Sequence, residues 1–140
     1  MSDRALTVDV AVLAGSPALS VLLVNRANEP FAGAWALPGG FVDDGERIRD
    51  AAARELAEET AVAAGELELF GVYDAPGRDP RGATMSIAYL MRAPAELEAR
   101  GGDDAREARW WPLGALPALA FDHAELIADA ISCAARDPRT

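Results

Sequence analysis

The strongest constraint on the fold is the segment of residues 46–60, which lacks glycine and proline and is rich in helix-forming residues. It predicts an α-helix. Its second half reads RELAEE and places Glu55, Glu58 and Glu59 three and four residues apart. With about 100° per residue, Glu55 and Glu59 share a side with the apolar Ile48. The glutamates therefore border the surface by which this helix is expected to pack on a sheet.

Such a cluster of carboxylates is unfavourable unless something offsets it. Like charges four residues apart destabilise a helix by roughly 0.2–0.5 kcal/mol per pair, and desolvation at a buried margin adds to that cost. A solvated polar face is the simple alternative. A bound cation would explain the cluster better, because hard carboxylate oxygens suit Mg²⁺ or Mn²⁺. The preceding Gly39 and Gly40 would let the backbone approach an ion closely, with a carbonyl available as a further ligand.

The remaining segments predict an α/β fold. A second helix is expected to begin near Asp122, where DHAE has the spacing of a capping box. The order of strands, helix, strands and helix predicts a mixed sheet covered by helices in a single domain over residues 1–140. Runs of apolar and β-branched residues predict five strands, at residues 6–14, 18–25, 67–73, 84–93 and 108–113. The first two are expected to form an antiparallel pair.

Composition excludes some classes of function. The formal charge is −10 and all thirteen basic residues are arginine, which argues against sequence-independent binding of DNA or RNA. A small anionic ligand remains compatible, because a divalent cation can reverse the local field. No apolar run approaches the roughly 20 residues of a membrane span, and the N-terminus has no signal pattern. The lone Cys133 fits a reducing compartment, so we expect a cytoplasmic protein without a membrane partner.

Residues 40–62, GFVDDGERIRDAAARELAEETAV, resemble the Nudix box, G-x5-E-x7-R-E-U-x-E-E-x-G-U. Every defined position matches except one, where Ala61 replaces the last glycine of the family. Ala61 could end the helix in a left-handed conformation at a cost of about 1–2 kcal/mol, or the helix could continue to Gly65. We expect the second. The resemblance covers roughly residues 6–135 and implies the Nudix α/β/α sandwich, with helices on both faces of a mixed sheet.

The resemblance also implies a metal-dependent reaction. Nudix hydrolases cut the pyrophosphate bond of a nucleoside diphosphate linked to another group, using Mg²⁺ or Mn²⁺. The matching positions make Glu55, Glu58 and Glu59 the expected metal ligands, with the carbonyl of Gly40 as a further ligand. Arg54 is expected to orient the glutamates by ion pairing.

The general base has two candidate sources, the box itself and a later acidic loop. The stretch GGDDAREARWW supplies Asp103, Asp104 and Glu107 in that loop, although an exposed acidic turn is an equally good interpretation. We expect Glu55 as the first candidate for the base and Asp104 as the second. Glu46 is expected to have a structural or outer-sphere role.

Substrate preference is not encoded in the box. The loop YDAPGRDPRG and the segment AFDHAE resemble the ADP-ribose pyrophosphatase-like branch of the family. Arginines in such a loop can bind phosphate or ribose bidentately, whereas a solvated loop, core aromatics and packing at the helix start are the alternatives. The expected substrate-binding residues are Arg26, Trp35, Arg78, Asp79, Arg81 and His123.

Three functions are compatible with these residues. The first is a pyrophosphatase acting on ADP-ribose or a related nucleotide sugar. The second is a pyrophosphohydrolase that removes damaged nucleoside triphosphates, and the third is a sensor that binds ADP-ribose without cutting it. The branch includes transcriptional regulators with an added winged helix, but the chain ends at Thr140, directly after the last expected helix. We therefore expect an enzyme that binds a small nucleotide rather than nucleic acid, with a homodimer as a possible assembly.

Overall fold

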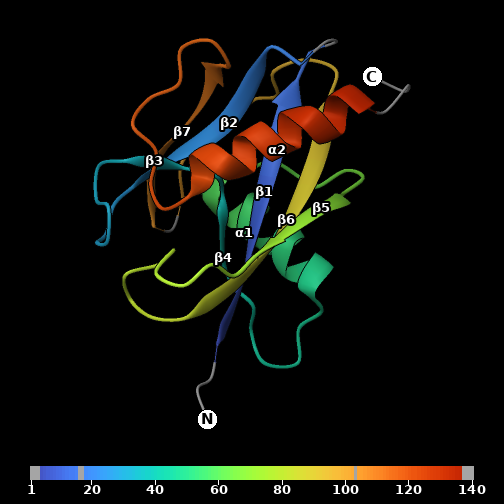
Figure 1. Cartoon of the computed structure of the whole chain (residues 1–140). Helices are drawn as coiled ribbons and strands as arrows, with labels where there is room; N and C mark the ends of the chain where they lie inside the picture. Colours follow the sequence, from blue (N-terminus) through green and yellow to red (C-terminus); the bar gives the residue numbers. More distant parts are fainter. Residues whose placement is uncertain (1–3, 16–17, 103, 137–140) are drawn as a thin grey trace.

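The computed structural model describes residues 4–15, 18–102 and 104–136, which form one seven-stranded sheet and two helices (Figure 1). The expected strands and helices are all present, with two further short strands around the glycine pair. In chain order the elements are β1 (Ala5–Ala14), β2 (Ser20–Arg26), β3 (Trp35–Ala36), β4 (Gly39–Phe41), α1 (Ile48–Thr60), β5 (Glu68–Tyr73), β6 (Thr84–Ala93), β7 (Ala105–Pro112) and α2 (His123–Arg136).

The sheet is mixed, as predicted. Its strand order is β3-β2-β1-β6-β5, with β4 paired to β1 and β7 paired to β2. Strand β1 runs parallel to β6 along its whole length and antiparallel to β2, but only at the pairs Leu13–Val21 and Ala14–Ser20. Nearer its start, β1 pairs with β4 instead, while β2 pairs with β7. The start of β1 and the end of β2 are therefore separated, and this separation leaves room for a pocket.

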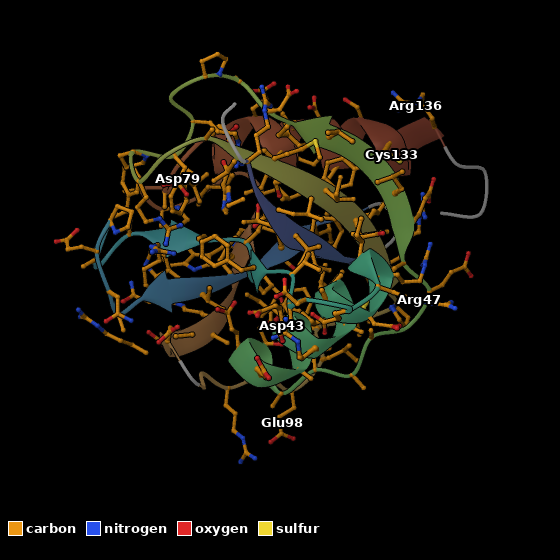
Figure 2. The ribbon with its side chains drawn as sticks, turned by 90° about the horizontal axis from the view of Figure 1, so that it is seen from below. Asp43, Arg47, Asp79, Glu98, Cys133 and Arg136 are labelled. Carbon is orange, nitrogen blue, oxygen red and sulfur yellow. The ribbon has the colours of Figure 1, made fainter. Side chains whose placement is uncertain are left out.

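The two helices cover opposite faces of the sheet, with α2 in front of β1 in Figure 1 and α1 behind it. The view from below shows the strands between the two helices (Figure 2). Side chains of a strand alternate between faces, so Val8, Val10 and Val12 pack with α1, while Ala11 and Leu13 pack with α2. This confirms the α/β sandwich. Among the described residues, no helix is both long and apolar enough to cross a membrane.

The end of α1 differs from the prediction. The helix stops at Thr60, and Ala61 adopts a left-handed conformation with φ 63° while its N–H donates to the carbonyl of Ala57. The prediction that the helix continues to Gly65 is therefore wrong. The turn directs Val62 into the core, where it is 3% exposed. Burial of a valine is worth about 1.5–3 kcal/mol, which exceeds the strain of about 1–2 kcal/mol at an alanine in this conformation.

The acidic segment before β7 is shorter than predicted. Strand β7 begins at Ala105, so Glu107 lies within it and pairs with Asn25 of β2. The expectation that Glu107 belongs to a loop is wrong, because β2 offers it a backbone partner. Asp104 occupies the turn just before the strand, and Asp103 lies outside the described residues.

Candidate active site

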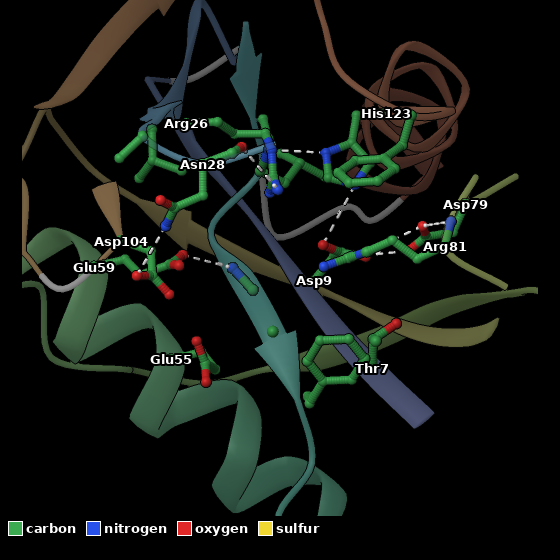
Figure 3. Close-up of a pocket in the computed structure, with 18 of the residues that line it drawn as sticks. Thr7, Asp9, Arg26, Asn28, Glu55, Glu59, Asp79, Arg81, Asp104 and His123 are labelled. Carbon is green, nitrogen blue, oxygen red and sulfur yellow. Dashed lines mark hydrogen bonds and ion pairs between the residues drawn. The ribbon is translucent and has the colours of Figure 1, made fainter. Parts of the chain in front are cut away.

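A pocket of about 350 Å³ opens where β1 and β2 separate (Figure 3). Its walls come from β1, β2, β4 and α1, from the loop of residues 74–83, from Asp104 and from the start of α2. Segments far apart in the chain thus meet here. Figure 3 shows Glu55 and Glu59 on the α1 side of the pocket, with Asp79 and Arg81 on the far side.

Arg54 organises the carboxylates of α1. Its Nε and Nη2 donate to Glu46 at 2.7 and 3.0 Å, and its Nη1 donates to Glu55 at 2.6 Å and Glu58 at 3.1 Å. The hydrogen bonds that Arg54 donates to Glu46 are the main cause that raises the pKa of Arg54 above its usual range. A planar guanidinium with five donors can hold several carboxylates in fixed directions. Arg54 thus links Glu46, Glu55 and Glu58, and its orienting role remains a prediction.

Glu59 is a partly buried carboxylate of the α1 wall. Its Oε1 accepts a hydrogen bond of 2.9 Å from the backbone N–H of Gly39. Burial raises the pKa of Glu59 to about 8, and the nearby charge of Glu55 acts in the same direction, although the hydrogen bond from Gly39 opposes it. A buried carboxylate with so high a pKa favours either a proton or a cation beside it.

Gly39 and Gly40 let β4 lie close to both α1 and β1. A Cβ atom on Gly40 would lie 2.5 Å from Oε2 of Glu55, and one on Gly39 would overlap the carbonyl oxygen of Val8. Any side chain at either position would push β4 away from α1 or β1. The close approach places the glutamates of α1 directly beside the backbone of β4.

The expected metal ligands are only partly brought together. Glu55 and Glu59 line the pocket, whereas Glu58 is exposed and bound by Arg54. Among residues 4–15, 18–102 and 104–136, no three or more acidic, histidine or cysteine side chains already converge as a metal site. The donors nevertheless suit a hard divalent cation, because Glu55 and Glu59 present carboxylate oxygens to one cavity beside the backbone of Gly40.

Two arginines share an aromatic ring in the opposite part of the pocket. The guanidinium carbon of Arg26 lies 4.9 Å from the ring centroid of Phe121, and that of Arg81 lies 5.7 Å from the same centroid. Arg26 donates from Nε to the carbonyl of Pro30 at 2.7 Å. Burial, followed by the neighbouring charge of Arg81, lowers the pKa of Arg26. Two cations held this close favour an anionic ligand between them.

The predicted loop residues differ in their accessibility. Arg78 donates to both carboxylate oxygens of Asp122, at 2.7 and 2.9 Å, and to Thr84 at 3.0 Å, and its side chain is only 5% exposed. It therefore ties the loop to the start of α2, and we do not retain it as a substrate contact.

Arg81 is 45% exposed and donates to the buried Asp79 at 2.8 Å. Burial disfavours the charge of Asp79, yet the hydrogen bonds from Arg81 hold its pKa below the usual range.

Trp35 is not among the residues that line the pocket, although the next residue, Ala36, is. It packs edge-to-face against Trp111, with ring centroids 5.1 Å apart and an interplanar angle of 72°. It also contacts the apolar cluster beneath α2. Trp35 therefore packs as a core aromatic, which was the alternative, and we do not retain it as a substrate contact.

Both candidate bases lie in the pocket. Asp104 joins Glu55 there, although 49 positions separate them in the chain (104 minus 55). Oδ1 of Asp104 accepts a hydrogen bond of 3.1 Å from the side-chain amide of Asn28. Asn28 was not expected at the site, because an asparagine in a loop carries no distinctive pattern.

A buried polar network in the wall of the pocket, formed by Asp9 and His123, was not predicted. His123 and Asp9 are 4% and 7% exposed, and Nε2 of His123 lies 3.4 Å from Oδ1 of Asp9. The other oxygen of Asp9 accepts a hydrogen bond from the hydroxyl of Ser86. Nδ1 of His123 accepts a hydrogen bond of 3.0 Å from the N–H of Leu37. Burial raises the pKa of Asp9 and lowers that of His123.

This placement changes the interpretation of His123. Both ring nitrogens face protein groups, so the packing alternative at the start of α2 describes it better than a contact to substrate. One signal could have revealed its partner. Asp9 is the only charged residue in the otherwise apolar residues 6–14, and a charge in a buried strand needs a partner.

Comparison with known proteins extends these observations. The family model for the NUDIX domain matches residues 3–130. The chain is 47% identical over 109 residues to an ADP-ribose pyrophosphatase of Methanocaldococcus jannaschii, covering 78% of this chain and 64% of that protein. It is 33% identical over 132 residues to the ADPR responsive transcriptional repressor NtrR of Acinetobacter baylyi, covering 91% of this chain and 53% of the repressor. The chain thus spans between about half and two thirds of these curated relatives.

A solved structure is also similar. The NUDIX domain of Shewanella oneidensis NrtR, determined in complex with ADP ribose, superposes with a TM-score of 0.87 at 33% identity. The match covers 95% of this chain and 90% of that domain. The similarity therefore includes the strands and helices that form the pocket.

Proposed function

Because this chain belongs to the NUDIX domain family, we propose that it hydrolyses the pyrophosphate bond of ADP-ribose or a related nucleotide sugar. One observation carries the proposal: a single pocket combines the carboxylate wall of Glu55 and Glu59 with the arginine pair Arg26 and Arg81. The 47% identity to an ADP-ribose pyrophosphatase and the ADP ribose bound by a similar domain support this choice of substrate.

The arginine pair accounts for binding of the diphosphate. A diphosphate carries several negative charges and needs cationic partners when it leaves water. Among the described residues, Arg26 has backbone carbonyls but no carboxylate as a hydrogen-bond partner. The charge of Arg26 is therefore available to phosphate oxygens. Arg81 adds a guanidinium that is 45% exposed, although two of its nitrogens are paired with Asp79. Aromatic rings under both guanidinium groups limit their motion and keep them directed into the pocket.

The carboxylate wall accounts for the dependence on a divalent ion. Glu55 and Glu59 would hold Mg²⁺ or Mn²⁺, with the Gly40 carbonyl and a reoriented Glu58 as further ligands. Once bound, such an ion neutralises phosphate oxygens and lowers the pKa of an attacking water. Arg54 keeps Glu55 in place through its hydrogen bond.

The same pocket holds the groups that would take the proton of the attacking water. Glu55 is our first candidate and Asp104 the second. Asp104 lies at the pocket with one oxygen bound by Asn28, which leaves its other oxygen to accept a proton. A carboxylate within hydrogen-bond reach of the water meets the geometric requirement for a general base.

A second candidate function is a sensor that binds ADP-ribose without cleaving it. The 33% identity to an ADPR responsive repressor favours this alternative. The carboxylate set of α1 favours the enzyme, because binding of an anionic nucleotide alone does not require two glutamates on one wall of the pocket. The net charge of −10 favours a small nucleotide over DNA as the ligand.

The test is to incubate the protein with ADP-ribose and Mg²⁺ and to separate the products. We expect AMP and ribose 5-phosphate from the wild type, loss of nearly all turnover in Glu59→Gln, and wild-type turnover in the exposed control Glu98→Gln. Tight binding of ADP-ribose without products, even with excess Mg²⁺ or Mn²⁺, would identify a sensor. Release of pyrophosphate from nucleoside triphosphates, with no action on ADP-ribose, would identify an enzyme that cleans the nucleotide pool.

A further inference from the structure

We propose that His123 and Asp9 are positioning residues that fix the backbone of residues 37–39 and, through it, the carboxylate of Glu59. The proposal rests on the proposed function in one respect, since it takes Glu59 as a metal ligand. It assigns His123 a role that does not require contact with substrate. It also assigns a role to Asp9, a buried carboxylate in the middle of the sheet.

The backbone of residues 37–39 is held from three sides. The N–H of Leu37 donates to Nδ1 of His123 at 3.0 Å, and the N–H of Gly39 donates to Oε1 of Glu59 at 2.9 Å. Between them, the carbonyl of Pro38 accepts a hydrogen bond of 2.9 Å from the N–H of Val10. One short segment therefore joins α2, β1 and α1, and a shift at Leu37 changes the donor that orients Glu59.

The ring of His123 is held in one orientation by its two partners. Because Nδ1 accepts the hydrogen bond from Leu37, the proton of a neutral ring is on Nε2. That nitrogen faces Oδ1 of Asp9 at 3.4 Å. Asp9 is itself held by the hydroxyl of Ser86 on β6. In metal sites, a carboxylate commonly fixes the tautomer and the direction of a histidine that binds the metal. Asp9 fixes His123 in the same way, although His123 acts here on the backbone and not on a metal.

Asp9 also contacts the segment directly. A Cβ atom on Gly39 would lie 2.6 Å from Oδ1 of Asp9, so this carboxylate packs against the backbone whose N–H binds Glu59. The alternation of side chains along β1 explains why Asp9 contacts both His123 and the backbone of Gly39. It points to the same face as Ala11 and Leu13, toward α2, while the pairing of Asp9 with Gly39 places β4 beside it. The path from Ser86 to Glu59 is thus continuous.

Substitutions at position 123 separate a positioning role from a stability role. Asparagine keeps an acceptor near the position of Nδ1, glutamine keeps a polar group near Nε2 but removes that acceptor, and leucine removes both. Tyr73→Phe is the matched control, because it removes a partly buried hydrogen bond of 2.7 Å to Asp129 that lies outside the pocket.

The first measurement is amide hydrogen exchange by NMR in the metal-free protein. We expect faster exchange at Leu37 and Gly39 in His123→Gln, with near wild-type exchange in His123→Asn and in the control. The second is the affinity for Mn²⁺ alone. We expect a loss of about tenfold or more in His123→Gln and Asp9→Asn, while His123→Asn and Tyr73→Phe bind Mn²⁺ as the wild type does.

Activity then provides a third measurement. When the rate is measured over a range of ADP-ribose concentrations at limiting metal, His123→Gln should lower kcat by a larger factor than it raises KM, because the proposal displaces a metal ligand and not a substrate contact. Equal Mn²⁺ affinity and equal exchange in the asparagine and glutamine variants would overturn the proposal, even if His123→Leu does not fold. A wild-type protein that binds no Mn²⁺ would instead overturn the proposed function, while the exchange rates would still decide whether His123 holds the segment.

Discussion

Glu59 should make the stability of the metal-free protein depend on pH. Its pKa is raised to about 8 in the folded protein, whereas an unperturbed glutamate titrates near pH 4.3. Between these values the folded chain holds a proton that the unfolded chain has released. Unfolding therefore releases a proton, so the free energy of unfolding falls as the pH rises through this window.

The size of the effect follows from the same difference. A single proton changes the free energy of unfolding by at most about 1.4 kcal/mol per pH unit. Asp9 acts in the same direction, because burial also raises its pKa, and His123 acts in the opposite direction below about pH 6.5, because burial lowers its pKa. The difference between the wild type and Glu59→Gln isolates the contribution of Glu59 from both.

The assay is urea unfolding followed by tryptophan fluorescence, in EDTA, at several values between about pH 5 and about pH 8.5. The wild type should lose stability relative to Glu59→Gln as the pH rises, and Glu98→Gln should follow the wild type. Saturating Mg²⁺ should remove most of the loss, since a cation binds the ionised carboxylate. Parallel stability curves for the wild type and Glu59→Gln across the whole range would refute the reasoning.

Five other substitutions give three separate predictions. Ala61→Gly should raise the free energy of unfolding by about 0.5–1 kcal/mol in urea, because it relieves left-handed strain, whereas Ala57→Gly inside the helix should lower it by about 1 kcal/mol. Arg54→Lys should weaken Mn²⁺ binding by about 10- to 100-fold in calorimetry, because lysine cannot fork between carboxylates. Arg78→Met should lower the free energy of unfolding by about 3–5 kcal/mol in urea, because it leaves Asp122 without its arginine. Arg81→Met should raise KM by about tenfold or more, and it should also lower the free energy of unfolding, because the buried Asp79 loses its arginine.

Much of the fold could be predicted because it depends on local patterns. The helix of residues 48–60 and the strands of residues 5–14 and 84–93 follow from their periodicity and composition. Pairing of β7 with β2 could not be foreseen, since it joins segments far apart in the chain. The left-handed conformation of Ala61 could not be predicted for a different reason. Burial of Val62 outweighs the intrinsic preference of alanine for a right-handed conformation.

The residues of the site also divide into those that local spacing predicts and those whose role depends on the tertiary fold. The spacing of Glu55 and Glu59 on one helix side predicts that they act together, and the structure places both in the pocket. The roles of Arg78 and Trp35 depend on partners, Asp122 and Trp111, that only the tertiary fold supplies. A motif identifies residue types at a site, but the distant partner determines whether a side chain is free to meet a ligand.

The most direct test of the proposed metal site is anomalous diffraction from crystals grown with Mn²⁺ and a nucleotide ligand. We predict a peak in contact with the carboxylates of Glu55 and Glu59, beside the backbone of Gly40. Absence of a peak there, in crystals that hold the nucleotide in the pocket, would contradict the account.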